Sequence, residues 1–374
     1  MKVYAKLRQN FLQPDNLYEL NPAKPFLPKV IVDMSTAQCQ QMVEKCLLCN
    51  GESFLLAAKM TDRLFGSPGE WNILCCKNPE CGLAWLSPRP TVDVLAKAYE
   101  NYYTHVEQNQ ESFARNLYQR FRRGYLNIHF GYHDSNVVLL DKVIGQLLAL
   151  LPHRRAAFDA SVMWLDALPG GALLEIGCGN GERVEFLDSL GWKAQGLEPD
   201  QTAAKIACSK GLNVLACTLG EADLLSESFD AILMSHVIEH LPDPLSVVRE
   251  CLRILRPGGK LIMLTPNTGS LGHRWYGRDW LHLDPPRHLF LFNRSSMSRL
   301  LDGAGYSRIS SRSVLRDAHL TFAASRALQK SGHYTFGVLS VMERIYGLIQ
   351  LYYEWMLLRI NPGVGEELLV IAIK

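Results

Sequence analysis

The sequence lacks an excess of charge of either sign: 39 lysine and arginine residues face 37 aspartate and glutamate residues, which leaves a net charge of +2. A chain so close to neutral gives no electrostatic reason to expect a nucleic acid as its partner. The apolar residues 336–358 cannot span a bilayer, because Glu343, Arg344 and Glu354 interrupt them. Residues 1–30 contain four prolines and show no signal-peptide pattern, so we expect a cytoplasmic protein.

The length of 374 residues allows one large domain with a smaller unit beside it. A content of 48% hydrophobic and 20% charged residues is ordinary for a globular protein. The Pro-Gly-Gly sequence at residues 169–171 marks the start of the large domain. We therefore expect an N-terminal extension, a cysteine-rich ribbon, a helical linker and a main domain, over residues 1–40, 41–92, 93–168 and 169–374.

Cysteines gather in the first part of the chain. Cys46 and Cys49 form one pair, Cys76 and Cys81 form a second, and a hairpin is predicted between them. Closely spaced thiolates on tight turns can face one ion, and four of them complete the tetrahedral geometry of a structural zinc site. The spacing predicts a zinc ribbon with these four ligands, and it favours Cys76 over the adjacent Cys75. Unligated thiols in a reducing compartment are the alternative.

A glycine-rich loop is the most informative motif in the chain. Residues 172–176 are typical of a buried strand, and glycines follow at positions 177, 179 and 181. A loop without side chains at alternate positions lets a ligand lie against bare backbone, at the carboxyl end of a strand in an open α/β sheet. About twenty residues later Glu198 ends a second predicted strand, where its carboxylate can bind both hydroxyls of a ribose.

Position 182 distinguishes two classes of cofactor. A nicotinamide or flavin site needs a third glycine there, whereas the residue is Glu182, whose carboxylate would repel a pyrophosphate at a helix start. The pattern E-x-G-x-G-x-G over residues 175–181 resembles instead motif I of the class I S-adenosylmethionine-dependent methyltransferases. A glycine turn in an unrelated α/β protein is the alternative.

The resemblance implies S-adenosylmethionine as the cofactor. This compound carries no phosphate, and its cationic amino-acid end tolerates a nearby carboxylate. The residues that the resemblance assigns to its site are Glu175, Gly177, Cys178, Gly179, Gly181, Glu198, Pro199 and Ser235.

Predicted strands alternate with predicted helices over residues 172–373, which indicates an α/β fold with a doubly wound, seven-stranded, Rossmann-like sheet. Short elements at residues 228–230, 256–259 and 265–267 follow the methyltransferase resemblance in order and spacing. With the cysteine ribbon in front, the chain resembles the bacterial group that includes the ubiquinone-biosynthesis O-methyltransferases.

Histidines and a glutamate follow the predicted strand over residues 228–235, at the edge where ligands of such sheets bind. Methyl transfer is an in-line displacement, so the protein must align a nucleophile and take up its proton, a task that suits a histidine. The candidate catalytic residues are His236, Glu239, His240 and His288.

The small-RNA 2′-O-methyltransferases carry a similar pattern, E-x-x-E-H with a later histidine, and hold magnesium with it. Here His236 stands in place of the first glutamate, and magnesium prefers oxygen ligands, whereas a histidine-rich set suits zinc or iron. Three interpretations stay open: a catalytic histidine without a metal, a second divalent metal, and purely structural residues.

Two further segments are expected beside the site. Residues 269–290 are rich in tryptophan and proline, which is typical of a lid over an apolar acceptor, or of an ordinary packed loop. A helical insertion over residues 318–362 is expected to cap the pocket, to pair two subunits as a homodimer, or to rest on a membrane surface. We expect a small-molecule acceptor methylated on oxygen; the alternative is a nucleic-acid-directed methyltransferase that binds through the ribbon.

Overall fold

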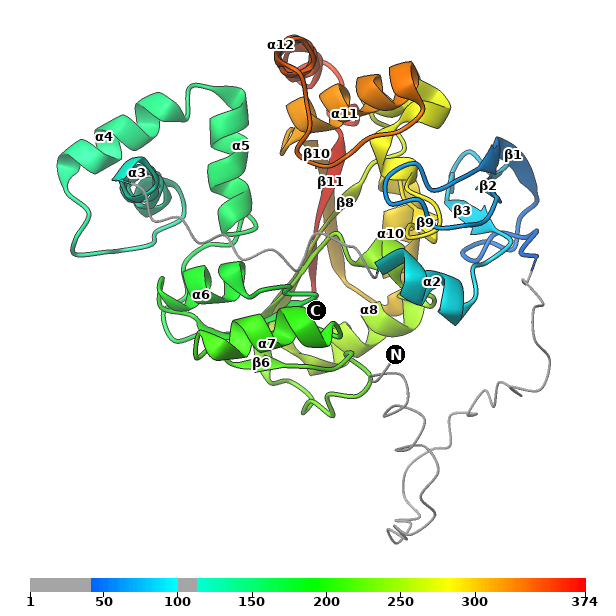
Figure 1. Ribbon diagram of the computed structural model, residues 1–374. Coiled ribbons are helices and arrows are strands. Elements are labelled where there is room, and N and C mark those ends of the chain that lie inside the picture. The colour runs from blue at the N-terminus through cyan, green and yellow to red at the C-terminus, as the bar shows by residue number, and fades with distance from the viewer. Residues whose placement is uncertain (1–41, 100–112) are drawn as a thin grey trace, which may run out of the picture. The chain divides into compact units, whose positions relative to one another are not determined.

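Seven strands form the main sheet of the computed structural model, which describes residues 42–99 and 113–374 (Figure 1). Their order across the sheet is β10-β11-β8-β7-β4-β5-β6. The five adjacent strands β8, β7, β4, β5 and β6 run parallel to one another. Strand β11 runs antiparallel to both of its neighbours, β8 and β10. Their bounds are β4 (Ala172–Ile176), β5 (Lys193–Leu197), β6 (Val214–Leu215), β7 (Phe229–Ser235), β8 (Leu255–Pro266), β10 (Arg308–Val314) and β11 (Glu367–Ile373). The predicted doubly wound α/β fold is confirmed.

The central strands are nearly continuous apolar runs because helices cover both faces of the sheet. Polar side chains start several of these helices: Asp200 caps α7, Asp243 caps α8 and Asn293 caps α10. The bounds are α6 (Glu182–Asp188), α7 (Gln201–Ser209), α8 (Pro244–Ile254) and α10 (Arg294–Ala304). Since β4 connects to β5 on one side and lies beside β7 on the other, the strand order reverses there, which is where such sheets bind ligands.

Two strands differ from the expectation. The sequence predicts a four-residue strand over residues 213–216, but the structure has only Val214–Leu215 there. The Arg-Pro-Gly-Gly sequence at residues 256–259 predicts a turn before the fifth strand, but β8 begins at Leu255, so these residues belong to an extended segment that pairs with β7 at Phe229 and again from Ala231 onward. Both differences lie at an edge or an end of the sheet, where hydrogen bonding to the neighbouring strand, rather than the apolar pattern, decides where a strand begins and ends.

The cysteine-rich region forms a second sheet of four strands in the order β1-β2-β3-β9. Three strands come from the region itself: β1 (Ser53–Met60), β2 (Trp71–Cys76) and β3 (Ala84–Ser87). The fourth, β9 (Phe290–Leu291), comes from the far end of the segment 269–290 and pairs antiparallel with β3. Neither β3 nor β9 was expected, because both are short and β9 forms only through this pairing.

The linker region forms the helices α2 (Val92–Tyr99), α3 (Phe113–His129), α4 (Leu139–Leu148) and α5 (Pro152–Ser161). Helices α3 to α5 pack on one face of the main sheet, whereas α2 packs against the other apolar cluster, which includes residues of the ribbon. Tyr125 and Leu126 of α3 are buried in the apolar cluster that also contains Leu173 and Ile262 of the sheet. Pro152 begins α5, whereas it was expected only to end the preceding helix; proline suits a first helical position because it needs no partner for a backbone N–H.

The remaining helices follow β8 and β10. They are α9 (Leu271–Tyr276), α11 (Ala318–Ser331), α12 (Val341–Leu357) and the short 3-10 helices η2 (Ile238–His240), η3 (Gly277–Asp279) and η4 (Leu281–Leu283). The described residues all belong to one compact unit, and the expected N-terminal extension over residues 1–40 lies outside them. The domain boundaries expected from the sequence stay a prediction. Within the described residues, no helix combines the length and the apolar character needed to cross a membrane.

Candidate active site and cysteine cluster

The three glycines after β4 have positive φ angles of 70°, 56° and 78° at Gly177, Gly179 and Gly181. A Cβ atom on Gly177 would lie 2.6 Å from Val237, and one on Gly181 would lie 2.6 Å from Leu212, so protein packing requires glycine at both positions. A Cβ atom on Gly179 would meet nothing within 4 Å. The backbone at Gly179 therefore faces open space, as a ligand-binding loop requires.

Two carboxylates flank this loop. Glu198 follows β5 and is buried; its Oε2 accepts the backbone N–H of Gly179 at 2.8 Å and its Oε1 accepts that of Asp200 at 2.9 Å. Glu175 lies in β4, forms an ion pair with Arg183, and keeps its buried Oε2 without a hydrogen-bond partner. Burial raises the pKa of Glu175 despite the nearby Arg183. An unpaired buried oxygen is costly, so it indicates a cationic or hydrogen-bond-donating ligand at this position.

The other residues expected at the cofactor site also lie at this edge. The thiol of Cys178 is buried against β5, since a Cβ atom on Gly196 would lie 2.5 Å from its Sγ, and burial raises its pKa. Only its backbone is therefore available to a ligand. Pro199 follows Glu198, and the Ser235 hydroxyl at the end of β7 accepts a hydrogen bond from Arg316 at 3.2 Å. No sequence pattern indicated the roles of Arg183 and Arg316.

His236 directly follows β7 and has a left-handed conformation with a φ of 55°. Its Nε2 lies 2.7 Å from Glu367 of β11, and its Nδ1 lies 3.3 Å from Glu239. Burial alone would lower the pKa of His236, but the two carboxylates outweigh it and raise the pKa to about 9. The ring is therefore an imidazolium at neutral pH, and both of its N–H groups point at carboxylates.

Glu239, His240 and His288 come together at the same edge. Each offers one ligand atom, and the three atoms all lie within 4.8 Å of one another. Burial would raise the pKa of Glu239, but the neighbouring His236 lowers it to about 2, and Thr265 donates to its Oε2 at 2.9 Å. Burial and the nearby His288 lower the pKa of His240 to about 4, so this ring is neutral.

The orientation of His288 follows from its hydrogen bond. Its Nδ1 lies 2.7 Å from the backbone carbonyl of His282, an acceptor, so Nδ1 carries the proton. In the neutral ring the lone pair is then on Nε2, which lies 4.0 Å from a carboxylate oxygen of Asp284 and can accept a proton or bind a metal. The ring centroids of His240 and His288 are 4.7 Å apart.

His282 is a fourth histidine at this edge that the sequence did not single out. Its ring centroid lies 6.0 Å from that of His236, and burial together with the charge of His236 lowers its pKa to about 3. Glu367 was expected only as part of the last strand. No local sequence pattern could indicate its pairing with His236, because His236 lies 131 residues earlier in the chain.

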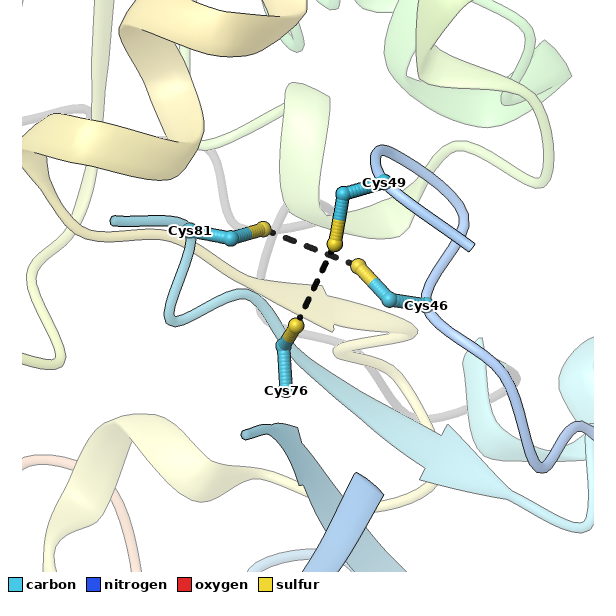
Figure 2. A group of neighbouring side chains, drawn as sticks. All are labelled: Cys46, Cys49, Cys76 and Cys81. Atoms are coloured by element: carbon cyan, nitrogen blue, oxygen red, sulfur yellow. Dashed lines mark hydrogen bonds between the residues drawn. The ribbon is translucent and has the colours of Figure 1, made fainter. Parts of the chain in front are cut away.

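The four expected zinc ligands also meet (Figure 2). The Sγ atoms of Cys46 and Cys81 are 3.6 Å apart, and those of Cys49 and Cys76 are 3.4 Å apart. Sulfurs around a tetrahedral zinc ion lie roughly 3.8 Å from one another, given a Zn–S distance of about 2.3 Å. The four thiols therefore have the separation and the chemistry that fit zinc. Cys75 is not a member of the group, as the spacing predicted.

A buried ion pair joins the cysteine-rich region to the segment that carries His288. Arg287 is completely buried, and its guanidinium binds both oxygens of Asp62, at 2.8 and 2.9 Å, and also Asp284. Asp62 in turn accepts backbone N–H groups of residues 64, 65 and 67. Burial would raise the pKa of Asp62, but Arg287 and these N–H groups hold it well below its usual value.

Comparison with known proteins agrees with the geometry. A family model described as a methyltransferase domain matches residues 148–311. This stretch includes β4 to β8, the glycine loop and the Glu239–His240 pair. Residues 148–311 of the chain thus match a methyltransferase domain. This match supports S-adenosylmethionine, the cofactor that the resemblance implied.

Curated relatives match only part of the chain. The ubiquinone biosynthesis O-methyltransferase of Xanthomonas campestris pv. campestris is 34% identical over 108 residues, which cover 27% of this chain and 45% of the relative. A probable S-adenosylmethionine-dependent methyltransferase of Mycolicibacterium smegmatis is 33% identical over 153 residues, covering 40% of this chain and 58% of the relative. The chain thus matches about half of the length of these relatives.

Two solved structures are also similar to part of this chain. A SAM-dependent methyltransferase of Thermotoga maritima has 22% identity and a TM-score of 0.39, with coverage of 69% of this chain and 99% of that one. One from Archaeoglobus fulgidus has 20% identity and a TM-score of 0.40, with coverage of 64% and 100%.

The substitution Asp62→Asn should destabilise the fold by about 3 kcal/mol, because it leaves part of the charge of buried Arg287 uncompensated. Urea unfolding followed by circular dichroism measures this change. Glu52→Gln is the control, since Glu52 pairs with Lys77 on the surface at 2.9 Å and should contribute at most about 1 kcal/mol. Equal effects of the two substitutions would contradict a structural role of the buried pair.

Proposed function

We propose that the chain transfers a methyl group from S-adenosylmethionine to an oxygen of a small molecule, which binds beside Glu239, His240 and His288. One observation supports this most strongly. The open backbone at Gly179, the unpaired oxygen of Glu175 and the histidine–glutamate cluster all lie at the carboxyl ends of adjacent strands. A cofactor and an acceptor bound there would be neighbours, as in-line displacement requires.

The residues around the glycine loop fit the cofactor. Glu175 would hold its ammonium group with the free Oε2, and Glu198, whose carboxylate lies between the glycine loop and the start of α7, would hold the ribose. The backbone of Gly179 would lie against the bound molecule. The cofactor supplies a methyl group activated by a sulfonium; the protein aligns the acceptor and takes up its proton.

His288 is the best placed proton acceptor. Its Nδ1 is held by the His282 carbonyl, so Nε2 is oriented and available. His236 is unsuited to this task, because it already carries a proton and donates to carboxylates. We assign it the electrostatic task of keeping Glu239 ionised.

The class of acceptor rests on the relatives. Several curated relatives are named ubiquinone biosynthesis O-methyltransferases, which favours a hydroxyl group as the methylated site. The lid expected over residues 269–290 contributes Trp280, which is buried, and Trp275, which is 43% exposed. These aromatic groups favour an acceptor with an apolar or aromatic part.

A divalent metal bound by Glu239, His240 and His288 is the second candidate, favoured by the convergence of these three side chains. Two imidazoles and one carboxylate suit zinc, iron or manganese better than magnesium. His236 does not complete the set, since its two nitrogens face Glu367 and Glu239.

We propose that Cys46, Cys49, Cys76 and Cys81 bind structural zinc. The pairing of β3 with β9 and the ion pair of Arg287 with Asp62 support a role of this ribbon in holding the segment with His288, rather than in binding nucleic acid.

Gly179→Val should weaken binding of S-adenosylmethionine at least about 30-fold, which corresponds to about 2 kcal/mol, because the new side chain would fill the space of the ligand. Gly211→Val is a matched control: Gly211 has a φ of 78°, and a Cβ atom there also meets nothing within 4 Å. Both substitutions strain the backbone, but only one lies at the site. Isothermal titration calorimetry measures the affinity, and equal binding by both variants would refute the cofactor site.

Purified protein should contain one zinc ion per chain by plasma mass spectrometry. Cys76→Ser should lose the metal and melt at a lower temperature, because a structural zinc site contributes folding energy. The matched substitution Cys75→Ser should keep the metal, since Cys75 is outside the cluster. Retention of zinc by the Cys76 variant would exclude this ligand set.

His288→Gln should lower turnover at least about 100-fold while leaving cofactor affinity unchanged, because a general base acts on the acceptor alone. The acceptor is first identified by incubating metabolite fractions with labelled cofactor. His333→Gln serves as the control, since His333 is exposed. Turnover that resists a chelator indicates the metal-free mechanism. Loss of turnover in a protein that keeps its zinc in the cysteine cluster, restored by added zinc, iron or manganese, indicates a second metal.

A further inference from the structure

Helix α12 buries a carboxyl group that has no partner. Its buried residues are Gly347, Leu351 and Glu354, and Glu354 is 0% exposed. Neither carboxyl oxygen of Glu354 has a hydrogen-bond partner. The other charged residues of the helix, Glu343 and Arg344, lie near its start, at least about 15 Å away along the axis. A buried carboxylate without a partner is strongly unfavourable, so this group either carries a proton or faces a cation.

Two more buried carboxyl groups lie near Glu354. Glu366 precedes β11 and Glu367 begins it, and both are buried. Burial raises the pKa of Glu354 well above its usual value, and the charges of Glu366 and Glu367 raise it further, against a smaller opposite effect of the Glu366 backbone N–H. Glu367 already faces His236, whose Nε2 lies 2.7 Å away. Glu354 is therefore a neutral carboxylic acid at neutral pH.

Within the described part of the chain, the helices around α12 bring no side chain that pairs with Glu354. Arg326 of α11 lies over an aromatic ring of α12 at 3.7 Å. His319 of α11 and His153 of α5 are neutral, because burial lowers the pKa of each. Tyr276 of α9 is a neutral phenol, because burial raises its pKa. Among the described residues, Glu354 also belongs to no group of three side chains that could hold a metal, so a proton is what neutralises it.

Glu366 anchors the segment 269–290 to the start of β11. Its Oε1 accepts the backbone N–H of Gly272 at 2.6 Å, and its Oε2 accepts the indole N–H of Trp280 at 2.7 Å. Burial raises the pKa of Glu366 to about 7, although these donors act to lower it. The anchor therefore changes its charge near neutral pH.

Helix α12 is attached to the same segment by two contacts. Tyr276 donates a hydrogen bond to Gln350 at 2.9 Å, and Trp275 stacks on Tyr353 with ring centroids 5.5 Å apart. Glu354 follows these two residues of α12 directly and within about one turn. Like charges repel strongly where water is excluded, so ionisation of both Glu354 and its neighbour at the anchor would strain this attachment.

We propose that Glu354 and Glu366 form a proton-dependent latch between α12 and the segment 269–290. A proton on Glu354 keeps the two parts in contact. When both carboxyl groups are ionised, the parts separate and water reaches the carboxylates. The proton is exchanged with solvent, and the latch does not depend on the methyl-transfer reaction.

The latch makes the folded chain less stable as the pH rises. A carboxyl group whose pKa is raised on folding binds more protons in the folded than in the unfolded chain. Its contribution to stability is complete below the ordinary value of 4.5 and is lost as the pH rises through the folded value. For Glu366 this loss is centred at about pH 7, and for Glu354 it continues at higher pH.

Hydrogen exchange of the full chain, read by mass spectrometry at about pH 6 and about pH 8.5, tests the latch. Protection factors, which correct for the intrinsic effect of pH, should fall at least about 10-fold in α12 and in the segment 269–290. Glu354→Gln, a neutral isostere of the protonated side chain, should keep them within about 3-fold and should melt higher than the wild type at about pH 8.5. Glu185→Gln is the control, since Glu185 is exposed on α6, and should respond like the wild type.

Infrared spectra test the proton directly. At about pH 7 exposed carboxyl groups are ionised, so the C=O stretch of a protonated carboxyl group reports buried ones. The wild type should show such a band that Glu354→Gln lacks. Glu366→Gln is a second variant: it keeps one acceptor oxygen, removes the charge of the anchor, and should also flatten the response of α12 to pH.

Wild-type protection that is equal at both pH values would overturn the proposal, as would a Glu354→Gln variant that loses protection like the wild type. An infrared band that is unchanged in Glu354→Gln would show that Glu354 is ionised when folded, which the latch forbids. Loss of protection spread evenly over the main sheet would also overturn it, because the latch opens only α12 and the segment 269–290.

Discussion

The parallel direction of β4, β5, β7 and β8 is the constraint on which the site depends. Parallel strands end at the same edge of the sheet. Residues from four stretches that are far apart in the sequence therefore meet there. The reversal of strand order at β4 keeps that edge open between helices on the two faces. Gly179, Glu198 and the Glu239–His240 pair are neighbours for this reason.

Backbone hydrogen bonds connect the ribbon to the candidate site. Leu86 of β3 donates a backbone hydrogen bond to Leu289, and Leu289 donates one to the carbonyl of Glu239. A continuous path of backbone hydrogen bonds thus leads from the ribbon, through the residue next to His288, to the carboxyl edge of the main sheet. A ribbon so small has little core of its own, so a metal bound by its four cysteines would hold both the ribbon and this path in place.

The strongest sequence signals were those of local origin. Apolar strand patterns predicted the α/β sheet, and paired cysteines predicted the cysteine cluster. Glycines at fixed spacing predicted which residues lie at the carboxyl edge of the sheet. Contacts between distant residues left no such signal. The pairing of Asp62 with Arg287 spans 225 residues, and β9 is a strand only because β3 lies beside it. Charged residues in loops usually face solvent, so nothing in the pattern distinguished Arg287 as a buried one.

Charge balance explains how one cluster holds histidines in different protonation states. His236 shares its two N–H groups between Glu239 and Glu367, so the positive charge is confined to this side of the cluster. That charge lowers the pKa of His282, while burial and the neighbouring imidazole lower that of His240. A neutral group next to a fixed ion pair can receive a proton without first losing one. The buried carboxylates therefore confine the positive charge to His236, and this charge helps to keep His282 neutral.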